Sequence, residues 1–271
     1  MVLYIDDDFD LDKIAESGQC FRWERVGGGW RIPHKGRCLT IEKLSEQEYR
    51  LDCAQQEFET LWRPYFDLDV SYAAIRERIE PERDPFLYRA AAYGRGIRIL
   101  RQDPWETLIS FIISQNRNIP AIRRSVELLC RAAGKPVDSG GGEPVYSFPT
   151  PEEILALDRE GLALCRLGYR DRYVLAAAKS TAENKHWPEA LAATDVGAAV
   201  AALTGFLGVG VKVASCVALF GLHRLDAFPV DVWMRRALSA EYPHGYPYDE
   251  YSPYNGVYQQ YMFYCYRSGK N

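Results

Sequence analysis

The sequence predicts an α+β fold, with a small N-terminal antiparallel β domain followed by a mainly α-helical domain that contains a helix-hairpin-helix motif. Three observations predict it. Residues up to about Arg63 alternate polar with apolar at the period of a strand, residues from Asp69 onward show helical spacing, and two glycines separate two apolar helical segments between 196 and 220. We therefore divide the chain into a β-rich domain at 1–84 and a helical domain at 85–271, with the hairpin near 196–220.

Short alternating runs in the N-terminal part predict the strands. They lie at 29–32, 37–41 and 49–53, and glycines at 27–29 and at Gly36 supply the turns between them.

Capping residues and apolar runs predict the helices. Asp103 is suited to cap a helix, Pro104 to occupy its first position, and Glu106 follows three residues after the cap, ahead of an apolar run that ends at Ile113. Further helices are expected at 119–133, 151–156, 172–182, 196–203, 211–220 and 257–267. Residues 135–147, with Gly140, Gly141 and Gly142, are expected to form a flexible loop.

The composition limits the class of protein. Hydrophobic residues make up 47% and charged residues 26%, as in a water-soluble globular protein. No run approaches the roughly 18 apolar residues of a membrane span, and the acidic stretch from Met1 to Phe9 lacks the order of a secretion signal. The seven cysteines are far apart, with no C-x-x-C pair. We therefore expect a cytoplasmic protein with no disulfide framework, no metal site and no cofactor.

The charge of the chain is unusual for a protein that binds nucleic acid. The net charge is −4, but the distribution of charge matters more than its total. Acidic residues crowd into 6–12 and 42–59, whereas arginines gather in the middle and late parts of the chain, as at Arg170 and Arg235. We expect a local basic surface on a protein that is acidic overall.

The strongest chemical signal is the segment Leu207-Gly208-Val209-Gly210-Val211-Lys212, between two predicted helices. Gly208 and Gly210 let backbone N–H groups approach a phosphate closely, and the following helix N-terminus adds a favourable partial charge. Glycines that merely end a helix are the alternative.

A second segment, Phe228-Pro229-Val230-Asp231-Val232-Trp233, places Asp231 nineteen positions after Lys212. Together the two segments resemble the helix-hairpin-helix glycosylase superfamily, with its hairpin L-x-G-V-G-x-K and its aspartate in P-V-D-V. Alkylpurine glycosylases share the hairpin and the aspartate but lack the lysine. Endonuclease III relatives normally add an iron–sulfur cluster, for which this chain has no closely spaced set of four cysteines.

Four more segments narrow the resemblance to the 8-oxoguanine DNA glycosylase/lyase family, and they occur in the order that this family has. They are SGQCFRW at 17–23, SQNRNI at 114–119, LGYRDRY at 167–173 and GVYQQYMF at 256–263. The resemblance implies a bifunctional enzyme of base-excision repair, a DNA N-glycosylase with lyase activity at abasic sites. Its partner would be double-stranded DNA that contains 8-oxoguanine, and it would need no cofactor.

Lys212 and Asp231 are the predicted catalytic residues. Lys212 is expected in the first turn of its helix, where the helix dipole disfavours a cation and so favours the neutral, nucleophilic amine. The resemblance implies that this amine attacks C1′ of the flipped nucleotide and forms a Schiff base. It also implies that Asp231 stabilises positive charge on the sugar and helps to deprotonate or orient Lys212. The alternatives are a lysine that contacts phosphate and an aspartate that only caps a helix.

Helical spacing groups the residues that the resemblance assigns to the damaged base. Cys216 is four residues after Lys212, and Phe263 is four after Gln259, so each pair shares one face of a helix. The resemblance implies that Cys216 and Phe263 stack on the two faces of the purine and that Gln259 reads its edge. It assigns to the backbone carbonyl of Gly18 the N7 hydrogen that 8-oxoguanine has and guanine lacks. Core packing, or a plain turn for Gly18, is the alternative.

The resemblance implies DNA contacts outside the pocket as well. Asn116, Tyr169 and Arg170 match positions that fill the gap left by the extruded base, wedge the stack and contact the orphaned cytosine. Two positions depart from the family. Ala121 stands where many members have an arginine that reads the opposite cytosine, so weaker discrimination among opposite bases is expected. Trp233 stands where relatives often have a histidine near a phosphate, which puts that contact in question.

Two other functions stay open on the sequence. A monofunctional glycosylase for alkylated purines would form no trapped adduct with DNA, and a non-catalytic hairpin module would bind DNA without cutting it. Lys212 and Asp231 together speak against the module, since phosphate binding requires no carboxylate. We also expect a monomer without membrane association, in the cytoplasm and associated with the nucleoid. The short chain without an added nuclear or mitochondrial signal suggests a prokaryotic source.

Overall fold

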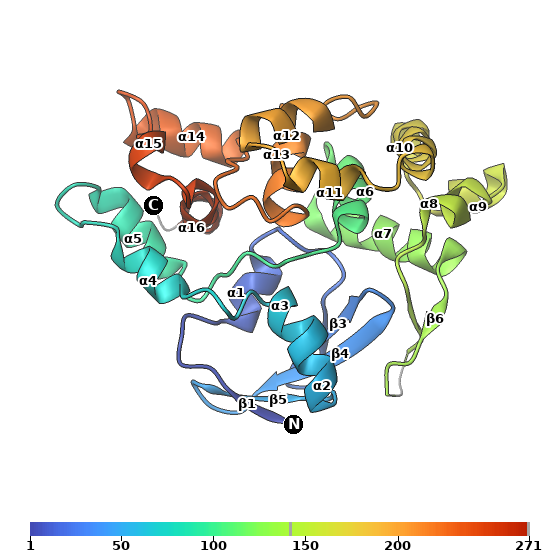
Figure 1. Ribbon diagram of the computed structural model, residues 1–271, viewed down its shortest axis with the longest axis horizontal. Helices are drawn as coiled ribbons and strands as arrows, with labels where there is room; N and C mark the ends of the chain where they lie inside the picture. Colours follow the sequence, from blue (N-terminus) through green and yellow to red (C-terminus); the bar gives the residue numbers. More distant parts are fainter. Residues whose placement is uncertain (141–142, 270–271) are drawn as a thin grey trace.

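The computed structural model describes residues 1–140 and 143–269, and in it an antiparallel sheet lies on one side of a larger group of helices (Figure 1). The five strands are Val2–Tyr4 (β1), Glu24–Val26 (β2), Gly29–His34 (β3), Arg37–Lys43 (β4) and Glu48–Leu51 (β5), in the order β1-β5-β4-β3-β2. The predicted fold class, an N-terminal antiparallel sheet followed by a mainly helical part, is confirmed.

The prediction that the chain is β-rich up to about Arg63 is wrong in two places. Helix α1 spans Leu11–Glu16, and helical turns run without a break through α2 (Gln55–Glu57), the π-helical turn η1 (Phe58–Trp62) and α3 (Arg63–Tyr65). Phe58, Trp62 and Phe66 follow one another at four-residue spacing and are fully buried against the sheet. Burial of this aromatic stripe on one helical face outweighs the strand pattern that precedes it.

The remaining elements are mainly helical. They are α4 (Tyr72–Glu77), α5 (Pro85–Tyr93), α6 (Pro104–Ser114), α7 (Ile119–Ala133), β6 (Pro136–Val137), β7 (Val145–Tyr146), α8 (Pro151–Leu155), α9 (Arg159–Leu164), the 3-10 turn η2 (Gly168–Arg170), α10 (Asp171–Glu183), α11 (Trp187–Ala192), α12 (Val196–Leu203), α13 (Val211–Phe220), α14 (Val232–Glu241), α15 (Tyr248–Tyr251) and α16 (Asn255–Arg267).

The predicted helices are all present, and their ends differ from the prediction by at most two residues. Helices α7, α12 and α13 have the predicted bounds, whereas α4, α5, α9, α11 and α15 were not predicted individually. The predicted loop at 135–147 carries the short hairpin of β6 and β7. Its Gly141 and Gly142 lie outside the described residues.

Side-chain caps explain why the helices near the site begin where they do. Asp103 Oδ1 accepts a hydrogen bond from the backbone N–H of Glu106 (2.9 Å) at the start of α6. Asn118 Oδ1 does the same for Ala121 (3.0 Å) at the start of α7. Each bond satisfies one of the backbone donors that a helix leaves free at its N-terminus, which fixes the first turn.

The described residues form two hydrophobic cores. The first lies between the sheet and its helices and includes Ile32, Leu39 and Trp62. The second fills the helical part and takes in Tyr72 and Ile75 of α4. The division of the chain at residue 84 stays a prediction.

None of the seven cysteines, all of which lie in the described residues, forms a disulfide with another. Across residues 1–140 and 143–269, no helix has the length and apolar character needed to cross a membrane.

Arg98 ties the two cores together. Its side chain is fully buried, and its guanidinium lies over the ring of Tyr72, 4.3 Å from the centroid. It donates hydrogen bonds to the backbone carbonyls of Asp8 (2.8 Å), Phe66 (3.1 Å), Asp67 (2.7 Å) and Val70 (2.5 Å). Three of these carbonyls belong to the connection between α3 and α4, and Asp8 lies between β1 and α1, so this one side chain joins two separate segments of the chain.

Replacement of Arg98 by Met should lower the free energy of unfolding by about 3–5 kcal/mol, because buried carbonyls would lose their donors. Urea denaturation measures this loss. The control is Arg50→Met, which removes an exposed ion pair with Glu42 and should cost less than about 1 kcal/mol. Equal losses in the two variants would contradict the role given to Arg98.

Candidate active site

One small cavity brings together residues from five segments of the chain. The cavity has a volume of about 50 Å³. It is lined by Ser17 and Gly18 after α1, Phe111 of α6, Lys212, Cys216 and Phe220 of α13, Pro229 and Asp231 before α14, and Gln259, Gln260 and Phe263 of α16. The residues predicted for catalysis and for base binding are therefore neighbours around one space.

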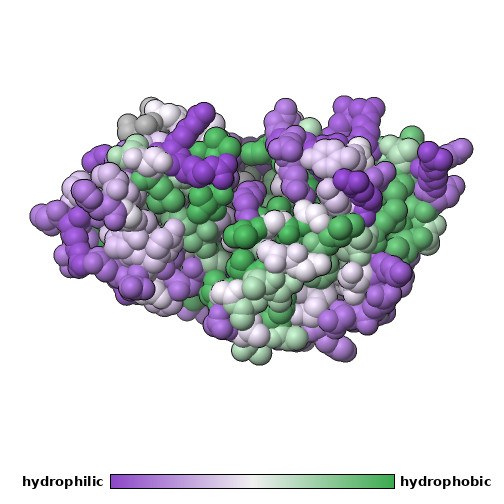
Figure 2. Space-filling model, turned by 90° about the horizontal axis from the view of Figure 1, so that it is seen from above, coloured by the Kyte–Doolittle hydropathy of each residue, from purple (hydrophilic) through white to green (hydrophobic). Residues whose placement is uncertain are grey.

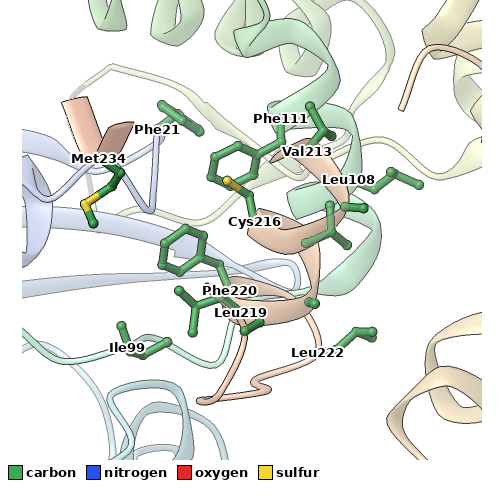
Figure 3. Close-up of a cluster of buried hydrophobic side chains, with 14 of the residues drawn as sticks. Phe21, Ile99, Leu108, Phe111, Val213, Cys216, Leu219, Phe220, Leu222 and Met234 are labelled. Carbon is green, nitrogen blue, oxygen red and sulfur yellow. The ribbon is translucent and has the colours of Figure 1, made fainter. Parts of the chain in front are cut away.

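Helix α13 fixes the position of Lys212. Every residue from Val213 to Phe220 is buried, whereas Val211 at the first position is exposed and Lys212 is half-buried. Figure 3 shows Cys216 beside Phe111 within the cluster of apolar side chains that surrounds this helix. The Nζ atom of Lys212 lies over the ring of Phe111, 5.2 Å from its centroid. The amine of Lys212, the only polar side-chain group in the first turn of α13, thus lies at the edge of an apolar wall.

Cys216 offers a neutral surface to the cavity. Burial raises the pKa of its thiol, and the nearby Lys212 opposes that shift without cancelling it. A thiol held neutral in this way is a poor nucleophile but a good packing surface. Its position fits contact with a base better than covalent chemistry.

Asp231 caps α14, as the sequence predicts. Its Oδ1 accepts a hydrogen bond from the backbone N–H of Met234 (2.8 Å), and its backbone is extended. Among the described residues Oδ2 has no hydrogen-bond partner, so one carboxylate oxygen remains for the cavity. The cap therefore fixes the carboxylate near Lys212 and leaves one of its oxygens available to a ligand.

Gln259 is almost fully buried on α16, and its amide is held from two sides. Its Nε2 donates to the carbonyl of Pro229 (3.0 Å), and its Oε1 accepts from Gln260 Nε2 (2.9 Å). A primary amide has two N–H donors and two lone pairs, so one donor and one acceptor stay available for a ligand. The amide orientation is thus set before anything binds.

The start of α16 is anchored by Asp226. Its carboxylate accepts hydrogen bonds from Asn255 Nδ2 (2.6 Å) and Ser252 Oγ (3.0 Å). This ties the segment that leads to Asp231 to the helix that carries Gln259 and Phe263.

Gly18 lies against the aromatic wall of the cavity. Its φ of +79° is in the left-handed region that favours glycine. A Cβ atom at this position would lie 3.3 Å from Cε1 of Phe263, closer than most side-chain contacts. The backbone conformation therefore favours glycine here, and a larger residue would press on the ring of Phe263.

The cavity is closed to a purine in this conformation. A volume of about 50 Å³ is enough for a few water molecules. The ring of Phe263 is only half-buried and packs on Gly18, so it is the side chain that can swing aside when a base enters.

The residues predicted to contact DNA outside the cavity also meet. Asn116, with a left-handed φ of +51°, donates from Nδ2 to the hydroxyl of Tyr169 (3.3 Å). Arg170 lies under the ring of Tyr169 with 4.3 Å between guanidinium and centroid. Its guanidinium is buried and donates to the carbonyls of Gln115 and Leu167. The contact of Arg170 with a cytosine stays a prediction, and it requires Arg170 to leave those carbonyls.

Exposed apolar side chains surround the hairpin and the start of α14. Leu207, Val211, Val232 and Trp233 are all exposed, and the guanidinium of Arg236 lies 5.2 Å from the ring centroid of Trp233. Figure 2 shows the molecule from above, with hydrophobic surface exposed between projecting hydrophilic side chains. This mixture of apolar and basic groups around the hairpin suits a nucleic-acid backbone and its bases. A contact between Trp233 and a DNA phosphate, which the replacement of histidine by tryptophan put in question, stays a prediction.

Sequence reasoning missed several residues of the cavity, among them Phe111, Phe220, Pro229 and Gln260. Phe111 and Phe220 stack on each other with centroids 5.6 Å apart. In the sequence both belong to continuous apolar helices, and nothing distinguishes them from ordinary core residues. In the part of the chain that the structure describes, no three His, Cys, Asp or Glu side chains are grouped so that they could hold a metal ion.

The two hairpin glycines differ in what surrounds them. A Cβ at Gly208, whose φ is +80°, would lie 2.5 Å from Cγ of Tyr173, whereas a Cβ at Gly210 would meet nothing within 4 Å. We expect Gly208→Ala to distort the hairpin, destabilise the protein and weaken DNA binding. Gly210→Ala should leave the stability unchanged within about 0.5 kcal/mol.

Thermal denaturation and DNA titration of both variants test this difference. A loss of DNA affinity in Gly210→Ala at unchanged stability would identify Gly210 as a point of close approach between backbone and ligand. Gly208→Ala with the stability of the wild type would contradict the steric assignment.

Comparison with known proteins follows the two parts of the chain. Residues 2–108 match the N-terminal domain of 8-oxoguanine DNA glycosylase. Residues 109–245 match the HhH-GPD superfamily of base-excision DNA repair proteins. Together the two matches cover the cavity residues except those of α16.

Individual relatives extend over most of the chain. The N-glycosylase/DNA lyase of Saccharomyces cerevisiae is 30% identical over 86% of this chain, which spans 68% of the yeast protein. The solved structure of MBOgg1 in complex with a low-affinity DNA ligand has a TM-score of 0.92 at 36% identity, and the match covers 100% of this chain and 96% of that one. The Clostridium acetobutylicum 8-oxoguanine glycosylase/lyase, solved with double-stranded DNA that contains cytosine opposite 8-oxoguanine, has a TM-score of 0.89 at 30% identity, with 100% and 99% covered.

Proposed function

Since the chain belongs to the 8-oxoguanine DNA glycosylase/lyase family of the helix-hairpin-helix superfamily, we propose that it excises 8-oxoguanine from double-stranded DNA and cleaves the strand at the resulting site. One observation carries the proposal. The lysine, the aspartate and the residues suited to read a purine line the same cavity, which lies at the N-terminus of the helix that follows the hairpin.

The proposed reaction begins with extrusion of the damaged nucleotide into the cavity. The neutral amine of Lys212 attacks C1′, the bond from C1′ to the base breaks, and the base leaves with the electron pair. Positive charge develops on the sugar, and the fixed carboxylate of Asp231 stabilises it. Opening of the sugar ring gives a Schiff base between Lys212 and C1′, and β-elimination then breaks the C3′–O bond and nicks the strand 3′ to the lesion.

The roles proposed for the pocket follow from what each group can donate or accept. The neutral thiol of Cys216 and the mobile ring of Phe263 would hold the two faces of the base. Gln259 has one free donor and one free acceptor for its edge. The carbonyl of Gly18 would accept the N7 hydrogen of 8-oxoguanine and repel the N7 lone pair of guanine.

Covalent trapping tests the reaction directly. Borohydride should reduce the Schiff base and leave a stable protein–DNA adduct with duplexes that contain 8-oxoguanine. Lys212→Gln should abolish the adduct, and Asp231→Asn should slow base removal by about 100-fold or more, the scale on which one stabilising group acts in a transition state.

The two rival functions give different results in the same assay. A monofunctional glycosylase for alkylated purines would remove bases without any trapped adduct. A DNA-binding module would leave 8-oxoguanine duplexes intact. Either result with the wild-type protein would overturn the proposal.

Ala121 concerns the base opposite the lesion. It is half-buried in the first turn of α7, and its methyl group has no donor or acceptor for a base edge. We propose that excision depends little on the opposite base. Duplexes with 8-oxoguanine opposite each of the four bases should be cleaved at rates within about tenfold, the discrimination that one lost contact removes. Strict dependence on cytosine would contradict this.

We also propose that the protein acts as a monomer in the cytoplasm, in association with the nucleoid. The acidic net charge of −4 keeps non-specific attraction to DNA modest, so contacts at the hairpin and the lesion must supply most of the affinity.

A further inference from the structure

The segment that carries Gly18 leaves the C-terminal end of α1, and two arginines grip that end. Arg123 of α7 donates from Nη2 to the carbonyl of Ala15 (3.1 Å). Arg267, in the last turn of α16, donates from Nη2 to the carbonyl of Glu16. The last carbonyls of a helix have no partner within the helix, so these donors satisfy groups that would otherwise need water.

The two arginines join parts of the molecule that have separate cores. Ile14 and Ala15 of α1 are buried in the core of the sheet. Helices α7 and α16 pack their buried faces in the helical core, with Val126 and Met262 among them. The two arginines therefore help to place the Gly18 segment relative to the helices around the cavity, together with the hydrogen bonds of the buried Gln19 to Arg98, Leu100 and Gln102.

Arg267 also contacts the aromatic wall of the cavity. It is four residues after Phe263 on the same face of α16, and its guanidinium lies 5.4 Å from the centroid of that ring. A Cβ on Gly18 would be 3.7 Å from Arg267 Nη1. Arg267 thus touches the backbone segment and the ring together, although it does not line the cavity.

This arrangement is costly for a purely structural contact. Arg123 Nε and Arg267 Nη1 are buried without a hydrogen-bond partner. Within the described residues neither guanidinium has a carboxylate within 4.0 Å. Burial lowers the pKa of Arg267, the charge of Arg123 adds a smaller effect in the same direction, and the charge of Glu16 opposes both. Apolar side chains of similar length would fill the space without leaving unpaired donors or like charges together.

We infer that Arg123 and Arg267 are positioning residues for lesion recognition. By donating hydrogen bonds to the carbonyls of Ala15 and Glu16, they set the position of Gly18 relative to Phe263. That position determines how the damaged base is oriented in the cavity. This inference rests on the proposed function, because it concerns how the same cavity selects its base.

Loss of Arg123 or Arg267 should affect base removal and strand cleavage differently. Removal of 8-oxoguanine needs the base-reading groups, whereas lyase action on a preformed abasic site needs only Lys212, Asp231 and the DNA contacts. A displacement of about 1 Å in a positioned group can reduce a rate by about 100-fold. We therefore expect Arg267→Met and Arg123→Met to lower the single-turnover rate of 8-oxoguanine excision by about 10- to 100-fold.

In the same preparations, the lyase rate on a preformed abasic duplex and the Kd for that duplex should stay within about twofold of the wild type, a difference in free energy below about 0.5 kcal/mol. Arg267→Lys keeps the charge and one donor for Glu16 but loses the planar group over Phe263, so it should recover part of the excision rate. The matched control is Arg131→Met, an exposed arginine on α7 paired with Glu127, which should change neither rate.

Three results would contradict the positioning role of Arg123 and Arg267. One is excision at the wild-type rate in both Met variants. Another is a parallel loss of excision and lyase activity in variants that fold normally, since that is what general loosening of the two parts would cause. The third is an equal loss in Arg131→Met. If a Met variant does not fold, the comparison is made with Arg267→Lys and Arg123→Lys. Failure of the wild-type protein to excise 8-oxoguanine would instead refute the proposed function.

Discussion

Burial of α13 is the constraint on which the rest of the site depends. From Val213 to Phe220 the helix presents no exposed residue, so it can neither rotate nor slide without exposing apolar surface. The hairpin leads into this buried helix through Gly208, which has a left-handed φ of +80° and lies against the ring of Tyr173. Lys212 is the point at which the fixed helix meets the cavity, and the packing of that helix sets the position of its side chain.

The other groups of the site are arranged around this fixed point from the outside. Asp231 is held by its own helix, and Gln259 by the carbonyl of Pro229 in the loop that precedes that helix. Asp226 links that loop to the start of α16. Phe263, half-buried and packed on Gly18, is the side chain that we propose moves when a base enters. The site is thus rigid where chemistry is proposed and adjustable where a base must enter, which is the usual distribution of order in a preorganised site.

The sequence was sufficient for features whose signal is local. Caps at Asp103 and Asp231 marked helix starts, and hairpin glycines marked the turn before Lys212, because each depends on a few neighbouring residues. The grouping of the pocket residues came from resemblance and helical spacing, and the structure brings them to one cavity.

Features that depend on tertiary contacts had no such signal. The helical run from Gln55 to Tyr65 is stabilised by aromatic burial against a sheet that a sequence window does not contain. The burial of Arg170, and the grip of Arg123 and Arg267 on α1, depend on carbonyls 55, 108 and 251 positions away. An arginine in the sequence reads as a surface charge, and only the fold shows which carbonyl it meets.

The central claim is that one amine, Lys212, becomes bonded to the sugar of the damaged nucleotide. Mass spectrometry of peptides from the borohydride-reduced complex tests it most directly, because it identifies the residue that carries the sugar remnant. We expect the remnant on the peptide that contains Lys212 and on no other. A remnant on the amino group of Met1, on Lys13 or on another lysine would contradict it.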